Sequence, residues 1–306
     1  MLAELDDLHA LLRANPLWYG PRGNVREAMV AFTTFREAIR GWRSGNFDIG
    51  LAPSDLDETA RLFTARGLGT DYIAYRVTDP PLSDVRVRRA LARALDRDAL
   101  RFPDLKLRGE SGGLIPPPLP AHSHDLALAF DPDRARRLLA EAGFPGGRGL
   151  RPLRLLSATG WGTDVPEWAI EQWAELGVSV QLEVLPGDAH DASLADPNRP
   201  VDIWRNGWVA DYPDPEGFLD TLLAANPAIH RDEALMALLR KARSSRDQEE
   251  RWQLYREADR RLVRELVSIV PLAHLDNSVG ARRWVEGVRL DSFRALPLLD
   301  QLNVRR

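Results

Sequence analysis

The feature that most constrains the fold is a strand, a helix and a second strand in succession between residues 153 and 184. Residues 153–157 (LRLLS) form a short apolar run, and residues 166–176 show helical spacing that ends at Gly177. Residues 178–184 (VSVQLEV) then place an apolar side chain at every second position, as a half-buried strand does. A strand, helix and strand in this order predict a right-handed parallel crossover, and with it an α/β fold.

The same periodicities, together with capping residues, predict the other elements. Asp84 and Asp131 stand where a side chain caps a helix, Pro132 suits a first helical turn, and Asp247 with Glu250 forms a capping box. We expect helices at 2–15, 36–43, 85–100, 132–142, 232–244 and 247–265, and strands at 24–32, 47–51, 72–77, 201–206 and 268–274. The proline-rich residues 102–125 predict an ordered loop.

Composition excludes several classes of protein. The 306 residues carry a formal net charge of −4, which is unlike the basic excess of nucleic-acid-binding proteins. The sequence has no cysteine, so disulfides, cysteine nucleophiles and thiolate metal sites are excluded. No apolar run reaches the length of a membrane span. The acidic N-terminal stretch does not resemble a signal peptide, so we expect either a chain that stays in the cytoplasm or a fragment that lacks its leader.

Catalytic motifs are scarce. No phosphate-binding loop, dinucleotide fingerprint or serine nucleophile elbow is present, and no cofactor is expected. His122 and His124 form an H-x-H pair, which can bind zinc, but no third ligand is visible at useful spacing. We therefore expect solvated loop histidines and no metal site. Asp211 and Asp214 lie close enough in sequence to raise the alternative of a glycosidase-like enzyme, which uses two carboxylates.

The segment NGWVADYPDPEGFL (residues 206–219) is the best candidate for a ligand site. It begins at the expected end of a strand and continues into a stiff aromatic loop, and ligands of open α/β sheets bind at the carboxyl ends of strands. Trp208 and Tyr212 offer flat surfaces with polar tips, and Asp211 suits an ammonium group. The alternative is that both aromatic residues belong to the core and that Asp211 lies in a surface turn.

Several stretches together resemble a known family. In order along the chain they are NPLWYG (15–20), RSGNFDIG (43–50), DVRVRRALARALDRDAL (84–100), GGLIPPPLPAH (112–122), FDPDRARRLLAEAGFPGG (130–147), GWVADYPDPEGFL (207–219) and SIVPLAH (268–274). Each stretch is weak alone, but their shared order resembles the C-terminal portion of the family 5 extracellular solute-binding proteins. These are the peptide, oligopeptide and nickel receptors of ABC importers.

The resemblance implies a type II periplasmic-binding-protein-like α/β fold. It implies one complete lobe with a mixed sheet flanked by helices (residues 72–274), bounded by hinge strands at 72–77 and 269–274. Residues 1–71 would form a partial first lobe, and residues 275–306 would return to it. In peptide-binding members the acid of the W-x-A-D-Y pattern pairs with the free amino group of the peptide, which is the position of Asp211 here.

The implied function is the substrate-binding component, or a truncated part of one, of an ABC importer, without enzymatic activity. The partners would be a peptide or other small solute and an ABC permease. The family implies a periplasmic or cell-surface location; the absent leader motivates the alternative of a cytoplasmic ligand sensor associated with a transcriptional regulator. The expected ligand contacts are Asn206, Trp208, Val209, Ala210, Asp211, Tyr212, Trp161 and Tyr75. Because a large first-lobe segment of the family pattern is missing, we expect weak binding.

Overall fold

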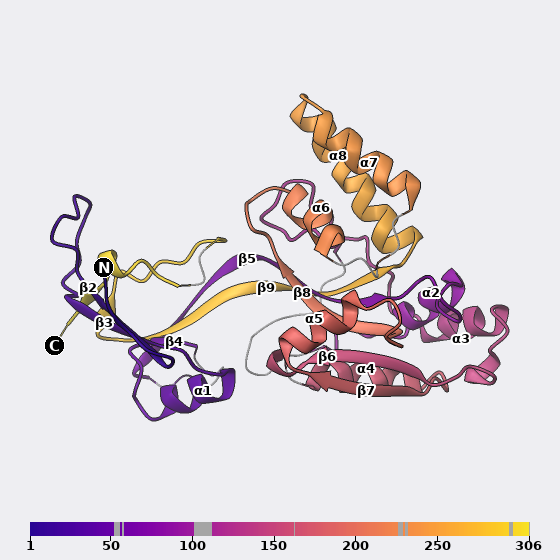
Figure 1. Ribbon diagram of the computed structural model, residues 1–306, viewed down its shortest axis with the longest axis horizontal. Helices are drawn as coiled ribbons and strands as arrows, with labels where there is room; N and C mark the ends of the chain where they lie inside the picture. Colours follow the sequence, from indigo (N-terminus) through magenta and orange to yellow (C-terminus); the bar gives the residue numbers. More distant parts are fainter. Residues whose placement is uncertain are drawn as a thin grey trace. The chain divides into compact units, whose positions relative to one another are not determined.

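Two long strands run through both parts of the protein. The structure is a computed structural model that describes residues 1–51, 56, 58–100, 112–161, 163–225, 229, 232–293 and 296–305. The chain divides into unit 1, which contains residues 1–67 and 276–306, and unit 2, which contains the described residues of 68–275. Strands β5 (Ala60–Tyr75) and β9 (Ile269–Arg282) contribute to both units (Figure 1). The expected lobe boundaries at residues 72 and 275 fall inside these two strands.

The main sheet is mixed. Its strand order is β4-β9-β5-β8-β6-β7, with β4 at Ile49–Gly50, β6 at Leu153–Ala158, β7 at Val180–Leu185 and β8 at Ile203–Val209. Strand β6 pairs in parallel with both β7 and β8, whereas β5 and β8 are antiparallel. The parallel pairing of β6 with β7 confirms the predicted strand, helix and parallel strand, because α4 (Asp164–Ala174) lies between them in sequence and Gly177, at a φ of 77°, follows that helix.

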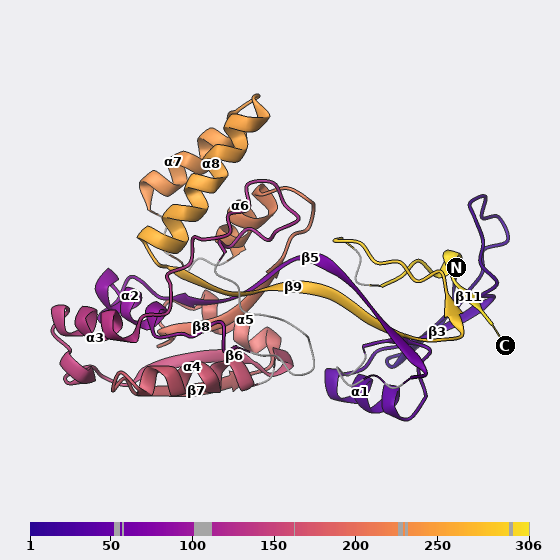
Figure 2. The same cartoon turned by 180° about the vertical axis from the view of Figure 1, so that it is seen from behind.

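Helices cover both faces of this sheet in unit 2. The core of one face joins Tyr72, Leu156 and Trp204 of the sheet to α5 (Gly187–Ala195), α6 (Glu216–Ala225), α7 (Glu233–Ser244) and α8 (Gln248–Arg260). Helices α2 (Val85–Arg93), α3 (Pro132–Glu141) and α4 lie together elsewhere; the Trp173 indole of α4 donates to Leu91 O of α2 at 2.9 Å. Figures 1 and 2 show α6, α7 and α8 grouped apart from α2, α3 and α4.

Capping side chains start the helices, and for Asp84 and Asp131 the sequence predicts this. The carboxylates of Asp84, Asp131 and Asp232 accept hydrogen bonds from backbone amides of the first turns of α2, α3 and α7. Asp247 likewise accepts from Glu250 N at 2.7 Å. The predicted capping box is only half present, because the Glu250 carboxylate binds the Ser245 hydroxyl and Lys241 instead. A π-helical turn (Arg261–Glu265) follows α8.

Unit 1 contains a three-stranded sheet where a helix was expected. Strands β1 (Leu2–Leu5), β2 (His9–Arg13) and β3 (Glu27–Ala31) pair antiparallel in that order, so the predicted helix at 2–15 is wrong. The Asp6 carboxylate accepts from Leu8 N and His9 N and thereby favours a turn. Leu2, Leu5 and Leu8 are about 60% exposed (58%, 64% and 61%). The leucines whose spacing suggested a helix therefore have no core to pack against.

The rest of unit 1 is built from short elements. Helix α1 (Phe35–Arg43) begins with a complete capping box at Thr34 and Glu37, and it ends before Gly45 as predicted. Strand β10 (Val285–Glu286) pairs with β11 (Asn303–Val304), and a 3-10 turn (Leu299–Gln301) precedes β11. Val285, Val288 and Leu302 form a small core there. Further 3-10 turns lie at Pro145–Gly147 and Thr159–Trp161 in unit 2.

Candidate functional site

The candidate segment begins inside strand β8. This strand continues to Val209, beyond the expected end at residue 206, so the loop starts only at Ala210. The register places Trp208 opposite Thr70 and Asn206 opposite Tyr72 of β5. Side chains directly opposite each other share a face of the sheet, so these four residues line one face at the carboxyl end of β8.

The Trp208 ring is held in place by the helix that follows. Its Nε1–H donates to Gly217 O of α6 at 2.7 Å, and the half-buried ring packs against the core of unit 2. A core position and a ligand contact were the two alternatives for this residue. Trp208 combines a buried portion with an accessible one, and the hydrogen bond fixes the accessible portion in one orientation.

Tyr212 packs against the same helix start. It is 40% exposed, and a Cβ placed on Gly217 would stand 3.4 Å from its ring, so ring and helix backbone are in close contact. Burial and the neighbouring charge of Glu216 raise the pKa of Tyr212, although a hydrogen bond with Thr221 lowers it. Tyr212 is therefore a neutral phenol at physiological pH that presents part of its ring to solvent.

Asp211 and Asp214 differ in their surroundings. The Asp211 side chain is exposed, and no described residue forms a hydrogen bond or ion pair with its carboxylate. Asp214 instead accepts two hydrogen bonds of 2.7 Å from the Arg251 guanidinium of α8. Burial tends to raise the pKa of Asp214, but the hydrogen bonds from Arg251 and from Glu216 N outweigh it, so this pKa is lowered. The loop thus shows one carboxylate without a described protein partner beside one that is fully engaged.

The other expected contacts are dispersed. Val209 is 59% exposed, whereas Ala210 is buried and its amide donates to Leu68 O at 2.9 Å. The Asn206 side chain accepts from Gly207 N. Tyr75 is fully buried, opposite Ile203 and beside the charges of Arg88 and Arg97, so the structure does not bring it together with Trp208 and Tyr212. The side chain of Trp161 lies outside the described part of the chain.

Residues that the sequence patterns did not single out lie on the same face as Trp208. Thr70 donates its hydroxyl hydrogen to Leu114 O at 2.8 Å and contacts His274 Nδ1 of β9 at 2.9 Å. The rings of His274 and His122 meet edge to face, with centroids 5.4 Å apart. The sequence analysis placed His274 in the expected strand 268–274 but gave it no role, since 204 positions separate it from Thr70. Within the described ranges, no three His, Asp or Glu side chains are gathered to hold a metal ion.

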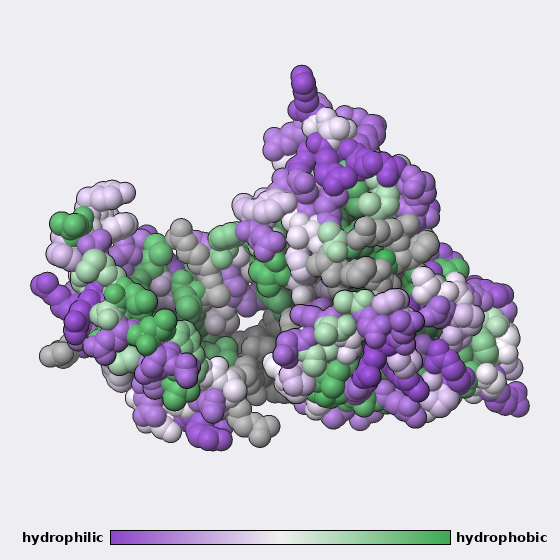
Figure 3. Space-filling model, in the orientation of Figure 1, coloured by the Kyte–Doolittle hydropathy of each residue, from purple (hydrophilic) through white to green (hydrophobic). Residues whose placement is uncertain are grey.

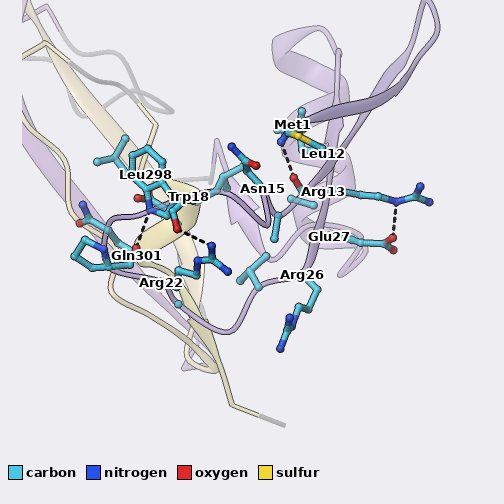
Figure 4. A pocket seen from close by; sticks show the side chains of 17 residues that line it. Met1, Leu12, Arg13, Asn15, Trp18, Arg22, Arg26, Glu27, Leu298 and Gln301 are labelled. Carbon is cyan, nitrogen blue, oxygen red and sulfur yellow. Dashed lines mark hydrogen bonds and ion pairs between the residues drawn. The ribbon is translucent and has the colours of Figure 1, made fainter.

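Unit 1 contains a cavity of its own. It has a volume of about 720 Å³ and lies among residues of the loop after β2, of β3 and of the turn before β11 (Figure 4). Leu12, Trp18, Val25 and Leu298 give it an apolar lining. Arg13 at its rim pairs with Glu27 at 2.9 Å. This cavity belongs to unit 1 alone, whereas the segment from Asn206 to Tyr212 belongs to unit 2. No described helix is long and apolar enough to cross a membrane.

Known proteins are similar to this chain in sequence. The model of the bacterial extracellular solute-binding proteins, family 5, matches residues 8–229. A heme-binding protein A of Haemophilus influenzae is 28% identical over 73% of this chain and 42% of its own length. A probable di/tripeptide-binding protein of Pseudomonas aeruginosa is 27% identical over 92% of this chain and 56% of its own. The chain thus spans about half the length of these relatives.

A solved structure extends the similarity to the fold. The periplasmic binding protein of an ABC transporter from Helicobacter pylori, in complex with the peptide STSA, superposes with a TM-score of 0.81. The two sequences are 18% identical, and the match covers 99% of this chain and 62% of that one. This agreement confirms the type II periplasmic-binding-protein-like α/β fold that the sequence resemblance implied.

Proposed function

Because the chain belongs to the bacterial extracellular solute-binding proteins, family 5, we propose that it is the substrate-binding component of an ABC importer, or part of one. Its ligand is a peptide or a related small solute, as the names of the relatives suggest. It works outside the cytoplasm and delivers the ligand to an ABC permease. Residues Asn206–Tyr212 supply one wall of the ligand site.

This proposal rests on the exposure of the Asp211 carboxylate and on its lack of a described protein partner. An exposed carboxylate without a described protein partner stands just after β8, in the same short segment as Trp208 and Tyr212, whose rings contact the start of α6. A charge-assisted hydrogen bond to a free amino group is the interaction that such a carboxylate can offer. The flat faces of Trp208 and Tyr212 suit the chain that follows an amino group. The site therefore recognises a primary ammonium group next to an apolar or planar moiety.

The glycosidase alternative requires a second available acid. A general acid needs a raised pKa, whereas hydrogen bonds to Arg251 outweigh burial and lower the pKa of Asp214. The Asp214 carboxylate also caps the start of α6 through Glu216 N at 2.9 Å. These contacts give Asp214 a structural role and support binding without catalysis.

Calorimetric titration with small peptides tests the role of Asp211. We would compare alanyl-alanine with its N-acetylated form, on this chain and on the whole reading frame that contains it. We expect binding of the free amine, loss of most affinity on acetylation, and a similar loss in Asp211→Asn. Loss of one charge-assisted hydrogen bond corresponds to roughly 1.5–3 kcal/mol, or about 10- to 150-fold in Kd.

A matched control separates the local effect from the loss of a charge. Glu175→Gln also removes one exposed negative charge, from the end of α4, and should leave peptide affinity unchanged. Peptide binding that is equally strong in Asp211→Asn would reject the role of Asp211. Failure of the whole reading frame to bind any peptide would reject the proposed ligand class.

A further inference from the structure

Three imidazoles from two distant segments meet in unit 2. His122 and His124 belong to the loop before α3, and His274 belongs to β9. His122 Nε2 lies 3.1 Å from His124 Nδ1, and their rings meet edge to face with centroids 4.5 Å apart. The ring of His274 meets the ring of His122 edge to face, with centroids 5.4 Å apart. His122 is half-buried and His124 is exposed, so solvent reaches the pair.

Hydrogen bonds determine which ring nitrogen of His122 carries a proton. His122 Nδ1 lies 2.6 Å from Ile115 O, and a carbonyl oxygen can only accept. Nδ1 therefore carries the hydrogen, and in the neutral ring Nε2 carries a lone pair. That lone pair faces His124 Nδ1, which donates to it in the resting pair.

The same reasoning applies to His274. The Thr70 hydroxyl has one hydrogen, which it donates to Leu114 O, so it must accept from His274 Nδ1–H. The neutral His274 ring thus has its lone pair on Nε2. A Cβ placed on Gly112 would stand 3.0 Å from this nitrogen and 3.2 Å from His122 Cε1, so the loop backbone packs closely against both rings.

The loop that carries the pair is firmly anchored. Leu114 N donates to the buried Asp259 carboxylate of α8 at 2.9 Å, and Ile115 N donates to the same carboxylate at 3.3 Å. Gly113 N also donates to Ser123 O at 2.9 Å, which closes the loop just beside His122 and His124. The orientation of His122 is therefore set by backbone and core contacts on β5, α8 and the loop itself.

We propose that His122 Nε2 and His124 Nδ1 bind a divalent late transition-metal ion such as Zn²⁺, Ni²⁺ or Cu²⁺. Two imidazole nitrogens on one tetrahedral zinc ion, each about 2.0–2.1 Å from it, stand about 3.3 Å apart. The observed 3.1 Å is close to this value, so the two nitrogens keep nearly the same separation when the rings turn to direct both lone pairs at the ion. The neutral His124 ring shifts its proton from Nδ1 to Nε2, and no net proton is released.

The surroundings match the usual second shell of such ions. Metal-binding histidines commonly donate their other ring N–H to a backbone carbonyl, which is what His122 does toward Ile115. Imidazole ligands select zinc, nickel and copper over magnesium and calcium. Two imidazole ligands leave the remaining coordination positions of a tetrahedral ion open to water or another ligand.

Calorimetry with untagged protein tests the proposal. Titration of the chain with ZnCl₂, NiCl₂ and CuCl₂ should show one site, and MgCl₂ should give no binding signal. His124→Ala removes an exposed ligand without disturbing the core, and this variant should lose the site for all three ions. His9→Ala removes an exposed histidine of unit 1 and should bind as the wild type does. Near-ultraviolet circular dichroism checks that each variant is folded.

Spectroscopy supplies an independent readout. Electron paramagnetic resonance of the Cu²⁺-loaded chain should show coupling to two imidazole nitrogens, reduced in His122→Ala. Equal metal affinity in His124→Ala and the wild type, or no binding of any of the three ions, would overturn the proposal. Peptide affinity is measured separately, so either result leaves the test of Asp211 independent.

Discussion

Two buried carboxylates are stabilised in different ways. Asp71 of β5 is 1% exposed and forms an ion pair of 2.7 Å with Arg205 of β8, which is 4% exposed. Asp259 of α8 is fully buried and accepts hydrogen bonds from the amides of Leu114 and Ile115. Burial raises the pKa of both acids, and it raises the pKa of Asp259 to about 6. Asp259 should therefore make stability depend on pH, whereas Asp71 should make stability depend on Arg205.

Replacing Asp259 should change how stability depends on pH. Its pKa in the folded chain, about 6, lies above the ordinary 3.8, so the folded state binds the proton more tightly than the unfolded state. The stabilising contribution is complete below pH 4 and is lost as the pH rises to 6 and beyond. Such a difference between the folded and unfolded pKa corresponds to at most ~3 kcal/mol at neutral pH. Asp259→Asn should reduce this loss, which urea unfolding at pH 4 to 8 measures.

The control for Asp259 is a carboxylate at the surface. Asp188→Asn changes an exposed residue at the start of α5 and should leave the pH profile of unfolding as it is in the wild type. An unchanged slope between pH 4 and 6 in Asp259→Asn would contradict the assigned ionisation.

Removing the cation of the buried ion pair should destabilise the chain strongly. Arg205→Met leaves the Asp71 carboxylate buried without that cation, and such losses cost about 3–5 kcal/mol. Adding Asp71→Leu to the same variant should restore much of the free energy of unfolding. Arg199→Met breaks an exposed pair with Glu183 and should cost under ~1 kcal/mol. Equal effects of Arg205→Met and Arg199→Met in urea unfolding would show that the buried pair contributes little.

At the scale of elements, α8 organises the loop that displays Asp211. Arg251 of α8 binds both oxygens of Asp214 and reaches Glu216 at 3.3 Å, which joins α8 to the first turn of α6. The same first turn contains Gly217, whose carbonyl oxygen accepts the hydrogen bond from the Trp208 indole. The aromatic rings and the loop are thus positioned through one guanidinium group.

Arg251→Lys should therefore loosen the loop. A lysine cannot form two parallel hydrogen bonds with one carboxylate, so we expect a loss of ~1–2 kcal/mol in stability. Backbone amides at 211–218 should exchange with deuterium faster than in the wild type. Arg256→Lys is the matched control, since Arg256 lies on the same helix and forms an exposed pair with Glu249. Unaltered exchange at 211–218 in Arg251→Lys would rule out the positioning role.

At the scale of the whole molecule, unit 1 exposes many apolar side chains. Leu17 is 86% exposed and Tyr19 is 95% exposed, and both lie in the loop after β2. Hydrophobic residues also gather on the surface around β2 and β3 in Figure 3. Large exposed apolar patches mark interaction surfaces or cause association.

We expect the isolated chain to self-associate as its concentration rises. Leu17→Ser combined with Tyr19→Ser should lower the oligomeric fraction in size-exclusion chromatography with light scattering. Glu4→Ser, at an exposed polar position of β1, should leave that fraction unchanged. A wild-type chain that stays monomeric at every concentration would contradict this expectation.

The sequence alone determined the elements whose signals are local. Helix caps such as Asp84 and Asp131, the glycine after α4 and the alternation of β7 act within a few residues, and the α/β class followed from them. The segment around Asp211 could also be selected, because its residue types and its likeness to a known family are written in one short stretch. Its role as a ligand contact stays a prediction.

Tertiary structure alone decided what depends on pairing between distant segments. The β1–β2 hairpin replaced a helix because its leucines have no core to face and its backbone pairs with β3. Tyr75 turned inward because the register sets its face of the sheet. His274 meets Thr70 and His122 for the same reason. Local periodicity does not predict such contacts, because they stabilise the fold only when strands far apart in the chain align.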